Sequence, residues 1–158
     1  MSSESRRSFL AGAGLAAVVG GMAAPEALAL GRQGEMKREV IKGSPRSQFS
    51  RAVRCGHMVW VSGVLGRAPG SGELATPGAG AQFQQALENL KASVEAAGKT
   101  MSKVVKCTCF ITEASEFALF NEIYAKFFPK DPPARSTVVV KELVLAGAKL
   151  EIECVAFV

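Results

Sequence analysis

The sequence is short of the residues from which metal and nucleotide sites are built. It has one histidine and four cysteines in 158 residues, with no phosphate-binding loop, nucleophile elbow or dinucleotide fingerprint. Cys107 and Cys109 are two residues apart, with no second close pair and no helping histidine, which disfavours a zinc site. We therefore expect no metal, four cysteines that pack as small apolar thiols, and His57 as a solvated residue in a turn.

A strong excess of one charge is also missing. The net charge is +5 with a pI near 9.2, which permits an anionic ligand but lacks the dense Lys/Arg clustering typical of nucleic-acid binding. Apolar residues make up 48% and charged residues 21%, which excludes a disordered or collagen-like chain. The length fits one small domain.

No apolar run is long enough to span a membrane. Residues 5–10, Ser-Arg-Arg-Ser-Phe-Leu, match a twin-arginine export signature, and a glycine-rich apolar run over 11–24 follows. Ala-Leu-Ala at 27–29 matches a cleavage site. We expect a signal peptide over 1–29, a single domain over 30–158, and export to the periplasm with no stable membrane span after cleavage. A retained anchor is the alternative, and the short run disfavours it.

The remaining pattern predicts strands, helix, strand, helix, strand, strand. Strands are expected over 36–41, 52–54, 58–62, 104–112, 135–140 and 149–157, and helices over 81–97 and 115–127. Gly98 is placed as the C-cap of the first helix and Ser115 as the N-cap of the second. The order favours one sheet in an α+β fold, with βαβ-type crossovers and both helices on one face.

The second face of that sheet has no residues left to cover it. Val138, Val139 and Val140 are apolar at three consecutive positions, which predicts a strand buried on both sides. We therefore expect the chain to self-associate through the uncovered face.

Two features are candidates for chemistry. Glu151 and Glu153 lie on one face of the last strand, and Arg135 opens a strand directly after two prolines. A carboxylate buried by association needs a partner or a chemical task, and a rigidly held guanidinium binds a carboxylate through two parallel hydrogen bonds. A solvent-exposed face and a solvated arginine are the plain alternatives, and spacing alone does not decide between them.

The segments 133–138 (Pro-Ala-Arg-Ser-Thr-Val) and 150–153 (Leu-Glu-Ile-Glu) resemble the signature of the Rid family. These are the reactive intermediate deaminases, also called YjgF-like or liver perchloric-acid-soluble proteins. Other matching segments occur in the family's order, at 59–63, 72–74, 86–90, 94–98 and 117–128. The resemblance spans about Val53 to Phe157.

The resemblance implies a chorismate-mutase-like (YjgF-like) α+β fold and a homotrimer. In that trimer the sheets form a central barrel, the helices lie outside, and ligand clefts lie between subunits. It also implies hydrolysis of 2-imino acids or their enamine tautomers to 2-keto acids and ammonia, as in a 2-iminobutanoate/2-iminopropanoate deaminase. No cofactor is implied, and the expected partner is a small 2-imino or 2-keto acid rather than a nucleic acid.

Site residues are carried over by position. Arg135 matches the arginine that holds the substrate carboxylate, and Glu151 matches the acid that positions or activates water. Ser62 and Asn121 match polar residues of the cleft, and Gly63 matches a glycine beside the ligand.

Three positions of the predicted cleft depart from the family's usual residues. Phe49 stands in place of a tyrosine, Val64 in place of a glutamine, and Thr137 where cysteine is frequent. Phe49 and Val64 predict a less polar cleft, with changed substrate preference or reduced activity. Two alternatives stay open: a trimer that binds small carboxylates without turnover, and RNA cleavage, which the modest charge and the lack of a histidine pair disfavour. For an exported deaminase, an exported amino-acid oxidase or dehydrogenase is the expected source of imine.

Overall fold

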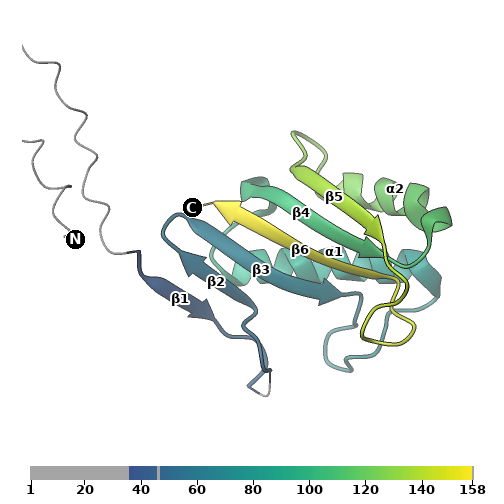
Figure 1. The fold of residues 1–158 in the computed structure, drawn as a ribbon, viewed down its shortest axis with the longest axis horizontal. Coiled ribbons are helices and arrows are strands. Elements are labelled where there is room, and N and C mark those ends of the chain that lie inside the picture. The colour runs from purple at the N-terminus through teal and green to yellow at the C-terminus, as the bar shows by residue number, and fades with distance from the viewer. Residues whose placement is uncertain (1–35, 46, 158) are drawn as a thin grey trace, which may run out of the picture. The chain divides into compact units, whose positions relative to one another are not determined.

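The structure, a computed structural model, describes residues 36–45 and 47–157. Six strands of this part form one sheet in the order β1-β2-β3-β6-β4-β5 (Figure 1). They are β1 (Arg38–Ile41), β2 (Ala52–Cys55), β3 (Met58–Leu65), β4 (Val104–Ile111), β5 (Ala134–Val139) and β6 (Leu150–Phe157). All six expected strands are confirmed, with β3 extending past residue 62 to Leu65. The signal peptide predicted over 1–29 lies outside the described residues.

Strands β1, β2 and β3 form an antiparallel meander. The turn between β2 and β3 needs a left-handed residue, and Gly56 supplies it with φ of 55°. His57 is exposed in this turn, as expected. Within the described residues, no helix is long and apolar enough to cross a membrane.

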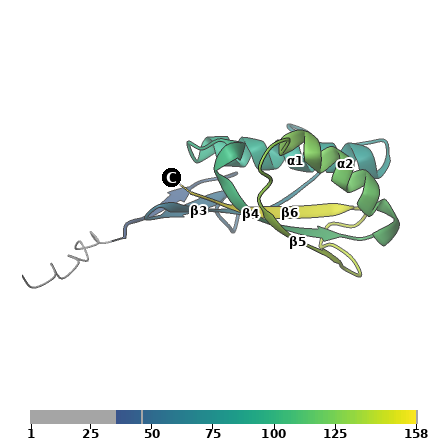
Figure 2. The ribbon, with the colours of Figure 1, turned by 90° about the horizontal axis from the view of Figure 1, so that it is seen from above.

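Both helices pack on the same face of the sheet (Figure 2). Helix α1 (Gly78–Ala96) connects β3 to β4, and α2 (Phe117–Phe127) connects β4 to β5, which pair in parallel. Strand β6 lies between β3 and β4 and is antiparallel to both. The expected mixed sheet with two helices on one face is therefore confirmed.

The core lies between the helices and the sheet. Helix α1 buries Phe83, Leu87, Leu90 and Val94 completely, at the predicted helical spacing. Gly98 follows the helix with φ of 72°, the left-handed conformation expected at its C-terminal end.

Three of the four cysteines belong to this core. Cys107, Cys109 and Cys154 are at most 2% exposed and face the helices, whereas Cys55 is half-buried. Burial raises the pKa of all three core thiols, that of Cys109 to about 12. The prediction of small apolar thiols is confirmed for these three.

The start of α2 differs from the sequence prediction. A 3₁₀ turn, Ala114–Glu116, precedes the helix, and Glu116 is the residue at the cap position, without a side-chain capping bond. Ser115 therefore lies inside that turn, and its prediction as the N-cap was wrong. The apolar spacing of the helix holds, because Phe120 and Tyr124 are buried.

The face of the sheet opposite the helices is open in the single chain. Val138 and Val139 are 46% and 55% exposed, because β5 is an edge strand and not a central one. The prediction of a strand buried on both sides is wrong for one chain: three consecutive valines indicated a central position that the topology gives to β6. Trp60, 46% exposed, also lies in the sheet beside Val155 of β6.

Candidate functional site

Arg135 lies near the start of the edge strand β5, where the chain leaves two prolines. Its register partner in the adjacent strand β4 is Cys107, a core residue. Because paired residues point to the same side of a sheet, the Arg135 side chain points to the helix face. The guanidinium Nη2 donates a 2.6 Å hydrogen bond to Oδ1 of Asn121, on α2. This bond brings two of the predicted site residues into direct contact.

Three aromatic rings of α2 surround the same guanidinium. Its Cζ lies 4.5 Å from the centroid of Tyr124, 5.3 Å from that of Phe120 and 5.6 Å from that of Phe117. Ring faces attract a cation and restrict its rotamers, so the arginine is held in place before any ligand arrives. We call Arg135, Asn121, these rings and Thr137 the arginine half-site.

Thr137 and Tyr124 form the floor of the arginine half-site. Thr137 stands opposite Cys109 in β4, with its hydroxyl oxygen buried. The Tyr124 hydroxyl is also buried, beside the Cys107 thiol, and burial raises the pKa of Tyr124. The floor is therefore a layer of uncharged groups, and Arg135 is the charge that the half-site presents.

Glu151 lies in β6, on the face of the sheet opposite Ile152 and Cys154. Its carboxylate occupies the space beside Gly63, where a methyl group on this glycine would clash with Oε1 and lie 2.9 Å from Cδ. Gly63 and Ser62 fall in a bulge, because three steps along β3 match two along β6 between Val61 and Val64. The glycine predicted to lie beside a ligand thus makes room for the catalytic candidate itself.

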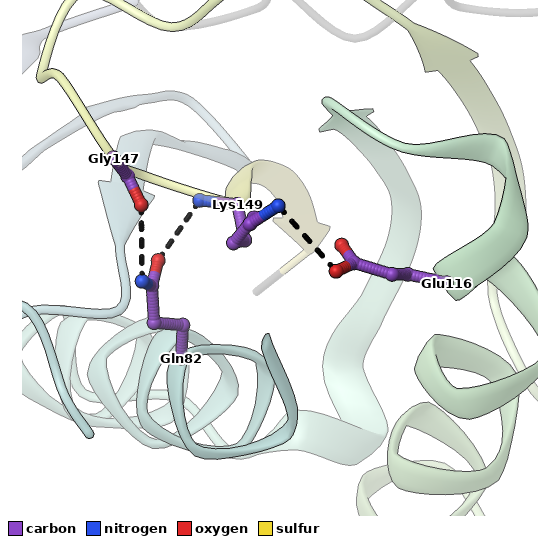
Figure 3. A network of polar contacts seen from close by, with 4 residues as sticks. All are labelled: Gln82, Glu116, Gly147 and Lys149. Atoms are coloured by element: carbon purple, nitrogen blue, oxygen red, sulfur yellow. Dashed lines mark hydrogen bonds and ion pairs between the residues drawn. The ribbon is translucent and has the colours of Figure 1, made fainter. Parts of the chain in front are cut away.

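A network of polar contacts holds the chain just before Glu151 (Figure 3). The Gln82 amide, on α1, donates to the Gly147 carbonyl at 3.1 Å and accepts from the Lys149 backbone N–H at 2.8 Å. The Lys149 ammonium lies 3.5 Å from a Glu116 carboxylate oxygen. Gln82 is 7% exposed, so the two hydrogen bonds of its amide are largely shielded from water and fix where β6 begins.

Gln82 is also the place where the end of β3 touches α1. A side chain at Gly66 would lie 2.7 Å from the Gln82 Cα, so only glycine allows this approach. Gln82 thus contacts both the end of β3 and the segment that leads into β6, the strand of Glu151. Sequence reasoning missed it, although an amide next to Phe83 in an apolar helical stripe is a signal of a buried polar contact.

A cavity of about 530 Å³ opens beside Gly63, between the 43–51 segment, β3 and α1. Phe49, Ser62, Gly63 and Val64 line it, which brings four predicted cleft positions together. Phe49 is 67% exposed, and the Ser62 hydroxyl donates to the Ser50 carbonyl at 2.7 Å. Val64 also packs against the core. We call Glu151, Gly63, Ser62 and Phe49 the glutamate half-site.

The two half-sites do not meet within one chain. Arg135 points to the helix face, Glu151 to the open face, and two inter-strand steps, about 10 Å, separate their strands. A small ligand held by Arg135 therefore cannot reach Glu151 of the same chain. Among the described residues, no three histidine, cysteine, aspartate or glutamate side chains are grouped so that they could hold a metal ion.

Comparison with known proteins gives one family. The family model described as Endoribonuclease L-PSP matches residues 41–158. The chain is 39% identical over 125 residues to Reactive Intermediate Deaminase A, chloroplastic, of Arabidopsis thaliana, covering 77% of this chain and 66%, just under two thirds, of that protein. It is 40% identical over 114 residues to a 2-iminobutanoate/2-iminopropanoate deaminase of Dermatophagoides farinae, covering 72% and 88%. A structure of E. coli TdcF with bound serine is similar, with a TM-score of 0.67 and 37% identity over 71% of this chain and 89% of that one.

Proposed function

The chain belongs to the endoribonuclease L-PSP family, to which the Rid proteins belong, and we propose that it hydrolyses reactive 2-imino acids to 2-keto acids and ammonia. Relatives named as deaminases at 39% and 40% identity support this activity. The bound serine in the similar E. coli protein supports a small, amino-acid-like ligand.

The observation that carries the proposal is the held guanidinium of Arg135. A cation fixed by Asn121 and by aromatic faces is suited to binding a planar carboxylate through two hydrogen bonds. Every 2-imino acid has that carboxylate next to its reactive carbon. Binding it orients the C=N bond, which is a large effect for a small substrate.

Glu151 is the group we propose for the chemical step. Protonation of the imine nitrogen makes its carbon electrophilic, and water adds there to give a carbinolamine. The carboxylate accepts a proton from that water and returns it to nitrogen. The C–N bond then breaks and ammonia leaves, while the hydroxyl gives up its proton to the carboxylate or to water and becomes the keto oxygen. No cofactor is required, because the reaction is a hydrolysis without net oxidation.

We propose that the working site forms between two copies, in a homotrimer. Arg135 of one copy and Glu151 of its neighbour then face the same ligand. Within one copy they cannot, because the two side chains lie on opposite faces of the sheet. The exposed Trp60, Val138 and Phe157 give the open sheet an apolar surface for association. Sedimentation of the purified protein tests this: a monomer at micromolar concentration contradicts it.

Imine hydrolysis tests the activity. An amino-acid oxidase generates 2-imino acids in the assay, and semicarbazide traps whatever imine survives. The protein is expected to suppress trapping, whereas Arg135→Ala at equal concentration is not. If neither protein has an effect on small or large imines but Arg135 still binds keto acids, the chain is a binding protein without turnover.

Export is a separate proposal. Arg6 and Arg7 in a twin-arginine signature support export to the periplasm with removal of residues 1–29. Replacement of both arginines by lysine is expected to retain the protein in the cytoplasm. An unchanged distribution between cytoplasmic and periplasmic fractions contradicts export by this route.

A further inference from the structure

The cavity beside Gly63 is lined by cationic side chains. Arg51 and Arg67 both line it, and no aspartate or glutamate of the described residues does. A concave site with one sign of charge concentrates ligands of the opposite sign. At about 530 Å³ the cavity is within the range of small-molecule sites and holds more than the three-carbon core of the simplest imino acid.

Most polar side chains of the cavity already have partners in the chain. Arg67 Nε donates to the Gly72 carbonyl, and Asn89 donates to the Leu65 and Arg67 carbonyls at 2.8 and 2.9 Å. The hydroxyls of Ser47, Ser62 and Ser93 donate to backbone carbonyls as well. The serine and asparagine side chains therefore have little donor capacity left for a ligand. Arg67 keeps the N–H donors of its two Nη atoms, but its bond to Gly72 ties the guanidinium to the loop.

Arg51 is different. Its guanidinium makes no hydrogen bond or ion pair with any residue of the described 36–45 and 47–157 segments. It is exposed at the cavity, two residues from Phe49 and paired through its backbone carbonyl with Ser62 N–H at 3.1 Å. Its side-chain donors therefore remain available for a ligand.

We propose that Arg51 binds a second carboxylate of the substrate, so that the site prefers 2-imino acids with an acidic side chain. This rests on the proposed function. Arg135 of the neighbouring copy holds the carboxylate next to the imine, Glu151 beside Gly63 acts on the imine carbon, and Arg51 holds the far end. The substrates are the imines formed by oxidation of acidic amino acids, and the products are dicarboxylic 2-keto acids.

Paired substrates of equal length test the proposal. Imines are generated from glutamate and from norleucine, whose side chains differ chiefly in the terminal carboxylate. The protein is expected to have a kcat/KM for the glutamate imine at least about tenfold above that for the norleucine imine. Arg51→Gln should remove this preference by lowering the glutamate value and leaving the norleucine value within about twofold.

Arg38→Gln is the matched control. It removes the same charge from exposed β1, outside the cavity, and should keep the preference. If both variants lose the preference for the glutamate imine equally, the effect is one of general charge and the proposal is overturned. A preference that survives Arg51→Gln also overturns it.

A binding measurement separates this inference from the proposed function. Calorimetry compares 2-oxoglutarate with 2-oxohexanoate for the same variants. If no imine is hydrolysed but 2-oxoglutarate binds more tightly and needs Arg51, the second-carboxylate site stands and the deaminase fails. If imines are hydrolysed with no effect of Arg51 on either measurement, the deaminase stands and this inference fails.

Discussion

The two half-sites are built in opposite ways. In the arginine half-site, large side chains hold the functional group: three aromatic rings and an amide of α2 pack around a guanidinium at the sheet edge. In the glutamate half-site, a missing side chain makes the room: a glycine in a bulge leaves space for a carboxylate, and an open cavity adjoins it. The first is thus fixed by side-chain packing and the second by backbone geometry, so different substitutions should damage them.

Inactivating one half-site in each of two variants should give the largest effect on activity. Arg135→Ala and Glu151→Gln are each expected to lower kcat/KM by about a hundredfold or more. Co-refolding of the two variants in equal amounts should restore roughly one quarter of wild-type activity, because about one interface in four then joins two intact halves. Differential tagging shows whether mixed trimers have formed. If they form and remain inactive, the two half-sites do not combine across copies.

A methyl group at Gly63 should damage the glutamate half-site alone. Gly63→Ala places a Cβ on the Glu151 carboxylate, which must move by about an ångström or more. We expect a loss of kcat of about tenfold to a hundredfold, since small misplacements of a catalytic group are costly. Binding of 2-keto acids through Arg135 should change little, and calorimetry checks this. Gly80→Ala, in α1, is the control for a glycine replacement, because the added atom meets nothing closer than 3.6 Å there and Gly80 has no positive φ.

Removing a ring should damage the arginine half-site alone. Tyr124→Leu takes away the face nearest Arg135 and buried core volume, so we expect a raised KM and about 2–4 kcal/mol less stability. Tyr124→Phe keeps the ring face and should keep KM within about twofold. If the two variants raise KM equally, the ring face does not position the guanidinium.

Cys109, which lies in β4 beside Thr137 of the arginine half-site, predicts a pH effect on stability. The folded protein keeps the Cys109 proton to about pH 12, whereas the unfolded chain releases it near the ordinary value of 9.0. The free energy of unfolding should therefore fall as pH rises from 9 towards 12, by at most about 1.4 kcal/mol per pH unit for this thiol. Denaturant unfolding at several alkaline pH values measures the slope, and Cys109→Ala should reduce it. Equal slopes in both proteins contradict the prediction.

Restoring the hydroxyl at position 49 should have the smallest effect. Phe49 is 67% exposed at the cavity, so Phe49→Tyr adds a hydroxyl without crowding the core. We expect a change in kcat/KM of about twofold to fivefold and a stability change within about 0.5 kcal/mol. A larger gain would show that the missing hydroxyl, not the half-site geometry, limits the reaction.

Local sequence pattern was enough to predict the strands, the helices and their common face. Alternation and helical spacing report which side of each element is buried, and this suffices for Phe83, Leu87 and Cys107. The cap of α2 was missed because Ser115 and Glu116 are both reasonable near a helix start, and the 3₁₀ turn that decides between them is a matter of tertiary packing.

The site was predicted as a set of residues and not as two halves. Arg135 and Glu151 were named from the family resemblance, but their opposite directions depend on the strand order, in which β6 lies between β3 and β4. Gln82 and Arg51 were not named, because one acts through backbone groups 65 and 67 residues away and the other through a cavity. Such long-range contacts leave little trace in local pattern.

The opposite directions of Arg135 and Glu151 also make turnover a question of concentration. If each working site needs two copies, a folded chain that is alone binds but does not react, and activity should follow the mass action of assembly. Specific activity, activity per chain, is then expected to fall on dilution below the dissociation constant of the trimer and to return on concentration. Turnover would thus begin only where the local concentration of the chain is high enough for trimers to form.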